Sequence, residues 1–259
     1  MIDLEKANKE FEKYVEKYNP EDSQIKLRIN HIKRVENIAK NIAKDLELNQ
    51  EDIELAGLIG LLHDIGRFEQ VRIYHTFDDK KSINHGEYGV KILFEEKLIR
   101  KFIKEEKYDT IIEKAIINHS KNRIEKGLSK QELLHAKILR DADKTDIMYV
   151  LTTDDTRAIY GRYDISDSIM TEEIFREFME DNEIQYAERK SPVDFIISFF
   201  AYIFDFYFNY GLKYIEKQNY LSNLYNRYQF KDKKTQTKLK EAYEYAKKYL
   251  EKELKNNKE

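Results

Sequence analysis

Residues 51–66 read EDIELAGLIGLLHDIG, an apolar stretch that closes on the pair His63-Asp64 and then on Gly66. His63 lies four residues after Ile59, so its ring faces the same side of the expected helix as the apolar side chains. The glycine two residues after Asp64 favours a helix end at this point. The stretch therefore predicts a buried helix that presents two polar side chains at its end, from different angles.

Helical patterns extend on both sides of this stretch. They occupy residues 31–48, 91–103, 109–120 and 130–151, where apolar residues recur at spacings of three and four. Two prolines and eight glycines in 259 residues also favour helix, and no run of strands is evident. Residues 65–84 show no sustained period and are expected to form a loop of about twenty residues, a length that is often functional. The sequence predicts an all-α fold.

Composition divides the chain into two parts. After Leu151 the helical pattern gives way to a polar connector, and aromatic-rich helices follow from Thr171 onward. We expect a helical core at residues 1–155 and a C-terminal helical extension at residues 156–259 that packs on this core. The most apolar stretch, residues 195–208, is shorter than the roughly 20 residues of a spanning helix, so it is expected to be a buried helix in a protein without a membrane segment.

Composition also excludes several classes of protein. The chain has no cysteine, which rules out disulfides and thiolate metal sites, fits a reducing compartment and predicts a cytoplasmic location. The 46 basic and 49 acidic residues give a net charge of -3, which disfavours general nucleic-acid binding. Residues 231–259 interleave lysine with glutamate and apolar residues, so we expect a solvated amphipathic helix there. The first twenty residues do not resemble a secretion signal.

Further histidines and carboxylates fall on apolar helical faces. His31, His119 and Asp143 each lie three or four residues from an apolar residue of their own helical pattern. A single inward histidine is usually a hydrogen-bonded core residue. Several imidazoles and carboxylates that face inward from separate helices cannot all remain solvated, and a buried charge without a partner is costly. A divalent cation is the common group that satisfies them together.

These residues resemble the ligand pattern of the HD-domain metal-dependent phosphohydrolase superfamily. The family pattern is a histidine, a His-Asp pair and a distant aspartate, which His31, His63-Asp64 and Asp143 match in order over about residues 28–150. The segment ILRDADKTDIMY resembles the family's Ala-Asp-Arg/Lys-x-x-Asp signature and points to Asp143 rather than Asp141. The resemblance implies an HD-domain helical bundle with additional C-terminal helices.

His85 and His119 match two further histidines of family members with binuclear centres, such as cyclic-dinucleotide phosphodiesterases and certain dinucleoside-tetraphosphate hydrolases. The resemblance thus implies a six-ligand site for two divalent metals. Without those two histidines a mononuclear site would remain. Nitrogen and oxygen ligands suit iron, manganese, cobalt, nickel or zinc. The implied metal ligands are His31, His63, Asp64, His85, His119 and Asp143.

The resemblance also implies roles in catalysis. Asp64 would bridge the two metals, and Arg67 stands where related binuclear enzymes carry a phosphate-contacting lysine, although a surface ion pair is the alternative. Lys144 is expected to contact a phosphate or to pair with a neighbouring aspartate. Asp78 or Asp79, in the long loop, is the candidate for protonating the leaving oxygen.

The implied function is hydrolysis of a phosphate ester or anhydride of a nucleotide-like substrate through a metal-bound hydroxide. The partner is then a small phosphorylated molecule. One alternative is a phosphodiesterase or dinucleoside polyphosphate hydrolase, although the glycine-tyrosine-proline signature of the cyclic-dinucleotide enzymes is absent. Another is a non-catalytic nucleotide sensor, which is disfavoured because every ligand position is filled.

Overall fold

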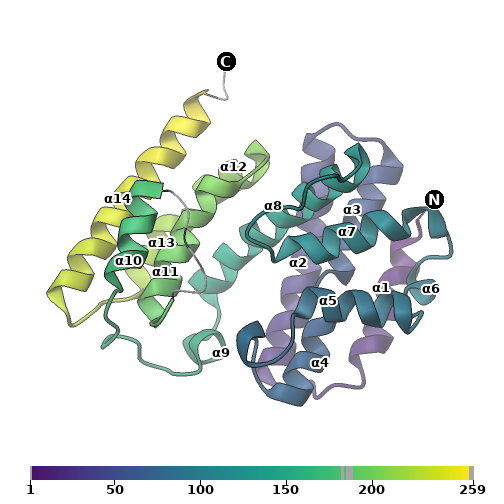
Figure 1. The fold of residues 1–259 in the computed structure, drawn as a ribbon, viewed down its shortest axis with the longest axis horizontal. Coiled ribbons are helices and arrows are strands. Elements are labelled where there is room, and N and C mark those ends of the chain that lie inside the picture. The colour runs from purple at the N-terminus through teal and green to yellow at the C-terminus, as the bar shows by residue number, and fades with distance from the viewer. Residues whose placement is uncertain (1, 182–183, 185–188, 257–259) are drawn as a thin grey trace. The chain divides into compact units, whose positions relative to one another are not determined.

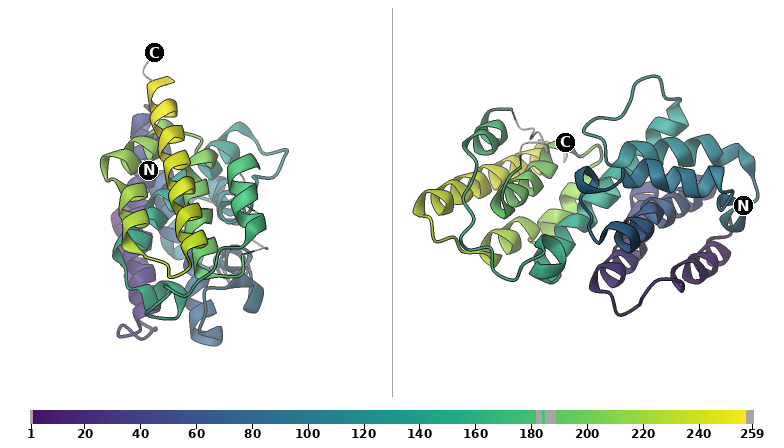
Figure 2. Two further views of the ribbon diagram at one scale, coloured as in Figure 1. Left: turned by 90° about the vertical axis from the view of Figure 1, so that its left-hand side faces the viewer. Right: turned by 60° about the horizontal axis from the view of Figure 1, so that its bottom comes forward.

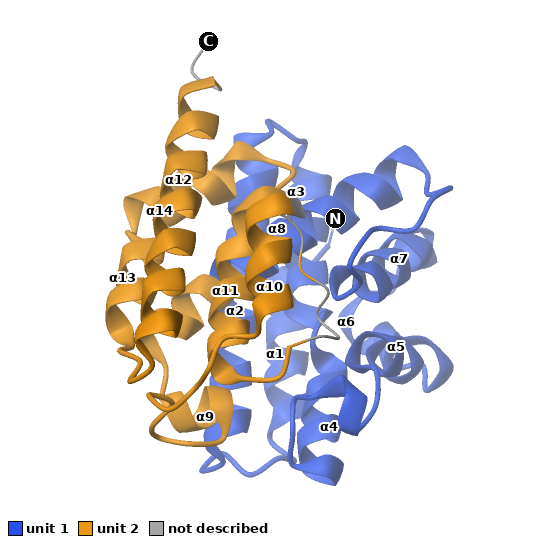
Figure 3. Cartoon of the chain, turned by 60° about the vertical axis from the view of Figure 1, so that its left-hand side comes forward, with its two compact units in different colours: residues 1–146 blue, residues 147–259 orange. Residues whose placement is uncertain are grey.

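The computed structural model describes residues 2–181, 184 and 189–256, and among them there is no strand. The predicted all-α class is confirmed. The chain forms two compact units, unit 1 (Met1–Asp146) and unit 2 (Ile147–Glu259), shown in two colours in Figure 3. The division into residues 1–155 and 156–259, with the extension packed on the core, stays a prediction.

Unit 1 holds the N-terminal helices and most of the long helix α8, which crosses the unit boundary (Figure 1). In chain order its elements are α1 (Leu4–Val15), α2 (Ser23–Asp45), α3 (Gln50–Leu62), α4 (Ile65–Tyr74), η1 (Asp79–Lys81), α5 (His85–Val90), η2 (Lys91–Glu95), α6 (Ile99–Phe102), η3 (Glu106–Tyr108), α7 (Asp109–His119) and α8 (Lys130–Thr153).

Helices α2 and α3 pack against each other in unit 1. Asp22 and Asn49 are their N-caps. The side chain of Asp22 accepts from two backbone amides of the first turn of α2, and that of Asn49 accepts from one backbone amide of the first turn of α3. Gly60 of α3 lies against the backbone of α2, where a Cβ atom would lie 2.9 Å from Cα of Glu36. Because glycine allows this close approach, the end of α3 reaches the helix that carries His31.

The structure corrects the expected loop at residues 65–84. Its first half is helix α4, which ends at His75 with a left-handed φ of 53°. The helix is too short to show a sustained pattern, and polar residues interrupt its apolar face. Three apolar side chains are nevertheless buried at a spacing of three residues, Ile65, Phe68 and Val71. Only the segment that contains η1 is an irregular connector.

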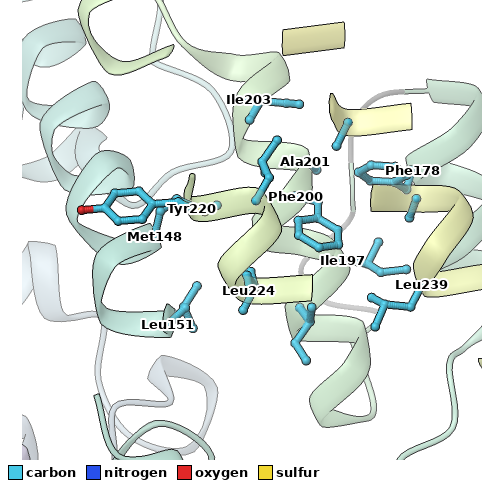
Figure 4. Close-up of a cluster of buried hydrophobic side chains, with 14 of the residues drawn as sticks. Met148, Leu151, Phe178, Ile197, Phe200, Ala201, Ile203, Tyr220, Leu224 and Leu239 are labelled. Atoms are coloured by element: carbon cyan, nitrogen blue, oxygen red, sulfur yellow. The ribbon is translucent and has the colours of Figure 1, made fainter. Parts of the chain in front are cut away.

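Unit 2 has its own apolar core. Its remaining elements are α9 (Thr156–Tyr160), α10 (Glu172–Arg176), η4 (Glu177–Asp181), α11 (Pro192–Phe200), η6 (Ala201–Asp205), α12 (Asn209–Lys217), α13 (Tyr220–Arg227) and α14 (Lys233–Asn256). Phe178, Phe200 and Leu224 are fully buried in this core (Figure 4). Helix α14, yellow in Figure 2, is the predicted amphipathic helix, with buried residues at spacings of three and four, Leu239, Ala242, Ala246, Leu250 and Leu254.

The apolar stretch at residues 195–208 is buried over much of its length, but it is not one helix. Helix α11 begins at a capping box of Ser191 and Asp194 and ends at Phe200, and the chain continues as the 3-10 helix η6. No helix in the described part of the chain has both the length and the apolarity of a membrane span.

Candidate metal centre

Four buried histidines meet in unit 1, and each comes from a different element. His31 lies in α2, His63 follows α3 as its C-cap, His85 begins α5 and His119 ends α7. Asp64, the N-cap of α4, and Asp143 of α8 complete the cluster. Within each of three sets, the ligand atoms lie within 4.8 Å of one another: His31, His63 and Asp64; His63, His119 and Asp143; Asp64, His85 and His119.

The Nδ1 atom of each histidine is held by an oxygen acceptor. These contacts are His31 to Oδ2 of Asp146 at 2.6 Å, His63 to the carbonyl of Gly60 at 2.8 Å, His85 to Oδ2 of Asp79 at 2.6 Å, and His119 to the carbonyl of Ile116 at 2.5 Å. A carbonyl or carboxylate requires a donor, so we assign the proton of each neutral ring to Nδ1. In the neutral form of each ring, Nε2 then carries a free lone pair, which is the form that binds a metal.

The Nε2 atoms converge where no proton donor meets them. Nε2 of His85 lies 2.9 Å from Nε2 of His119, so two lone pairs face each other. Within the described residues, Nε2 of His31 and His63 and Oδ1 of Asp64 are buried without a hydrogen-bond partner. Buried electron-pair donors without hydrogen-bond partners are costly, and a cation would satisfy them. The donor set therefore fits a divalent metal.

The two carboxylate oxygens of Asp64 face two different pairs of histidines. Oδ2 lies 3.6 Å from Nε2 of His31 and 3.4 Å from Nε2 of His63. Oδ1 lies 3.5 Å from Nε2 of His85 and 3.7 Å from Nε2 of His119. One carboxylate is thus placed between two sets of ligands, as a bridging ligand must be.

Asp143 lies beside one of the two histidine pairs, that of His31 and His63. Its Oδ1 atom lies 3.1 Å from Nε2 of His31 and 3.6 Å from Nε2 of His63. Burial opposes ionisation of Asp143, but His31 and His63, when they carry a proton on Nε2, hold its pKa well below the usual value, and a metal would take the place of that proton. It therefore presents a carboxylate to the His31 and His63 pair.

Arg28 is a residue of this site that the sequence reasoning missed. Its Nη1 atom contacts Oδ2 of Asp64, and its guanidinium lies 4.6 Å from the ring centroid of Phe77. Burial opposes ionisation of Asp64, but the charge of Arg28 holds its pKa well below the usual value. The available signal was position, because Arg28 lies three residues before His31 and so on the same face of α2.

Asp146 supports the centre from behind His31. It accepts the Nδ1 proton of His31 and binds Arg34 through two contacts, Nε to Oδ1 at 2.6 Å and Nη2 to Oδ2 at 3.0 Å. The residue lies in the segment around Asp143, and the sequence suggested it only as a candidate ion-pair partner of Lys144. Such a carboxylate fixes the orientation of a ligating imidazole.

Arg67 anchors the connector that carries Asp79. Its Nη1 atom donates to Oε1 of Gln70 at 2.7 Å, the carbonyl of Phe77 at 2.7 Å and Oδ1 of Asp79 at 2.8 Å. Burial, reinforced by Arg67, lowers the pKa of His85 to about 3, against the pull of Asp79. His85 is therefore neutral near pH 7. The phosphate contact of Arg67 stays a prediction.

The other predicted catalytic residues lie in different surroundings. Asp78 accepts a hydrogen bond from the backbone amide of Lys80 at 3.0 Å, and its Oδ2 atom lies 3.5 Å from Nζ of Lys81, so these contacts stay inside the connector. Lys144 is buried beside Asp143 on α8. The roles of Asp78, Asp79 and Lys144 in catalysis stay predictions.

A glycine contact brings α4 and α5 together behind the cluster. A Cβ atom on Gly66 would lie 2.3 Å from the carbonyl oxygen of His85 and 2.7 Å from the backbone nitrogen of Gly89. No side chain fits there. Because Gly66 follows Asp64 by two residues, this contact sets the approach of His85 to Asp64.

Residues 28–148 match the family model described as HD domain. These residues form an HD domain. The match contains all six clustered residues, and it confirms the HD domain predicted from the sequence, with further helices on its C-terminal side. HD domains bind divalent metals and are generally metal-dependent hydrolases. No curated protein and no solved structure matched the chain.

Proposed function

We propose that the chain is a phosphohydrolase with a six-ligand site for two divalent transition metals. The observation that carries this proposal is the arrangement of four Nδ1-anchored imidazoles around the two oxygens of Asp64. His31, His63 and Asp143 would hold one ion, and His85 and His119 the other. Asp64 would bind both.

The residues around the cluster support an anionic substrate. Neutral imidazoles and two carboxylates leave two divalent ions with a net positive charge. Bound divalent ions would supply a nucleophile near neutral pH and neutralise charge on phosphoryl oxygens. Arg28 contacts Asp64, and Nε of Arg67 lies 3.6 Å from Oδ1 of Asp64, so two positive charges lie beside the proposed bridging ligand, which supports a phosphate substrate.

Asp79 is better suited to holding His85 than to delivering a proton. Burial raises its pKa, but the hydrogen bond from His85 and the charge of Arg67 lower it to about 2. A group with that pKa is a carboxylate near pH 7 and is a poor general acid. Asp78 remains the candidate for the leaving-group proton.

A nucleotide-like phosphate ester or anhydride is the substrate class that we propose, with a cytoplasmic location. The test is a hydrolysis screen of nucleotides, dinucleoside polyphosphates and cyclic dinucleotides, before and after exhaustive chelation and after Mn²⁺ is restored. We expect activity that chelation removes and the metal restores. Full activity after chelation would contradict a metal-dependent reaction, and metal binding without hydrolysis of any compound would favour the nucleotide sensor.

A further inference from the structure

A buried arginine closes the end of the helix that carries His119. Arg140 lies on α8, three residues before Asp143, and only 3% of it is exposed. Its Nη1 atom donates to the carbonyls of Asn118 at 3.0 Å, of His119 at 3.5 Å and of Lys121, and its Nη2 atom donates to the carbonyl of Asn122 at 3.1 Å. One guanidinium thus binds the whole turn that follows α7.

The carbonyls of Asn118 and His119 require partners because α7 ends at His119. The last carbonyls of a helix have no backbone N–H donor within the helix, and they carry the negative partial charge of its C-terminal end. A guanidinium offers several donors in a rigid fork and a positive charge, which matches both needs. The turn is therefore held in one position relative to α8.

His119 is fixed by two contacts of different kinds. Its ring is oriented by the bond from Nδ1 to the carbonyl of Ile116, and its backbone is held by Arg140. A further contact joins α7 to the segment after the turn, because Oδ1 of Asn118 accepts a hydrogen bond from the backbone amide of Glu125 at 2.9 Å. The position of Nε2 of His119 therefore depends on both the ring contact and the held turn.

We propose that Arg140 is a positioning residue that sets the affinity of the second metal by holding His119 in place. This inference rests on the proposed binuclear site. It also gives α8 two roles, because the helix supplies Asp143 to one metal and positions a ligand of the other.

Unit 2 offers a matched control. Arg227 donates to the carbonyl of Leu151 at 2.7 Å, to the carbonyl of Asp154 and to Oγ1 of Thr156 at 3.4 Å, at the C-terminal end of α8. The chemistry is the same as at Arg140, but none of the six clustered histidines and aspartates lies at this helix end. If Arg140 only capped a helix end, substitution of Arg140 and substitution of Arg227 would have the same effect on metal binding.

The experiment compares the full-length wild type with Arg140→Met, Arg140→Lys and Arg227→Met. Mn²⁺ binding is measured by equilibrium dialysis, the spin coupling of the two ions by electron paramagnetic resonance, and folding by circular dichroism. We expect two sites in the wild type. Both Arg140 variants should bind the second Mn²⁺ about 10- to 100-fold more weakly, the range found when the support of a ligand is removed. They should keep the first site and lose the coupled signal at concentrations that saturate the wild type.

Arg227→Met should keep both sites with wild-type affinity. Unchanged affinity for both ions in the Arg140 variants, or equal weakening of both sites, would overturn the inference while the binuclear proposal stands. A wild type that binds a single Mn²⁺ would overturn both. If Arg140→Met does not fold, Arg140→Lys decides, because it keeps the buried charge and loses only the planar fork.

Discussion

Asp64 shows how one side chain organises this centre. Its two oxygens face separate histidine pairs, and Arg28 contacts one of these oxygens. Because the residue lies between α3 and α4, its backbone is fixed by two helices that pack through their own apolar side chains. The carboxylate charge should therefore be removable without loss of the fold.

Asp64→Asn keeps the shape of the side chain and removes its charge. We expect it to weaken the binding of both metals and to lower kcat by at least about 100-fold, because a metal ligand is lost outright. Metal analysis and steady-state kinetics measure the two effects, with the exposed Asp45→Asn as the control. Normal turnover of the Asp64 variant would show that the central ligand is assigned wrongly.

Variants of the adjacent residues Asp78 and Asp79 distinguish the positioning of a metal ligand from proton transfer. Asp79 accepts a hydrogen bond from His85, whereas Asp78 accepts one from a backbone amide of the connector. We expect Asp79→Asn to weaken the second metal about 10- to 100-fold, and Asp78→Asn to retain both metals. Calorimetric titration with Mn²⁺ distinguishes them. Retention of both affinities in Asp79→Asn would remove its proposed role, and a lower kcat in a fully loaded Asp78→Asn would support that residue as the general acid.

At the scale of elements, the crossing of α4 and α5 decides whether two histidine pairs share one carboxylate. The two glycines at the crossing are not equivalent. A Cβ atom on Gly66 would lie 2.3 Å from a backbone oxygen, whereas one on Gly89 would meet its nearest neighbour at 3.4 Å, an ordinary contact. The difference gives a variant and a control at the same place.

Gly66→Ala should push α5 away from α4 and move His85 from Asp64. We expect a loss of about 1–3 kcal/mol in the free energy of unfolding, as for other overpacked sites, together with weaker binding of the second metal. Gly89→Ala should change neither quantity markedly. Denaturant unfolding and metal titration measure both, and a Gly66→Ala protein with wild-type stability and two bound metals would refute this account of the crossing.

The sequence predicted the helices that have a sustained apolar period, and it missed a short helix and several single side chains. The six clustered residues were predicted from apolar helical faces and from the family pattern. Helix α4 was missed because only three large apolar side chains are buried in this short helix, Ile65, Phe68 and Val71, and they give too little periodicity. A period within one helix indicates the face on which Arg28, Asp146 and Arg140 lie, but it does not indicate which residues of other helices they contact.

At the scale of the molecule, the candidate metal centre lies within one of the two units. All six clustered residues lie in unit 1, and unit 2 is organised around its own aromatic and aliphatic core. A change in the core of unit 2 should therefore alter stability without altering the ligands.

Phe200→Ala tests this separation. Phe200 is fully buried in unit 2, and we expect its truncation to cost about 3–5 kcal/mol in the unfolding of that unit. Metal stoichiometry in the folded protein should stay at the wild-type value. Denaturant unfolding followed by circular dichroism gives the first quantity and elemental analysis the second. Loss of a metal from the folded variant would show that the centre depends on unit 2.

The most direct test of the binuclear centre is an anomalous-scattering map of the fully metal-loaded crystal. We predict two peaks about 3.5–4 Å apart, the spacing of two-metal hydrolases, with Asp64 between them. One peak should lie nearest His31, His63 and Asp143, and the other nearest His85 and His119. A single peak, with Nε2 of His85 and His119 more than about 4 Å away and so well beyond metal–nitrogen bonding distance, would contradict the account.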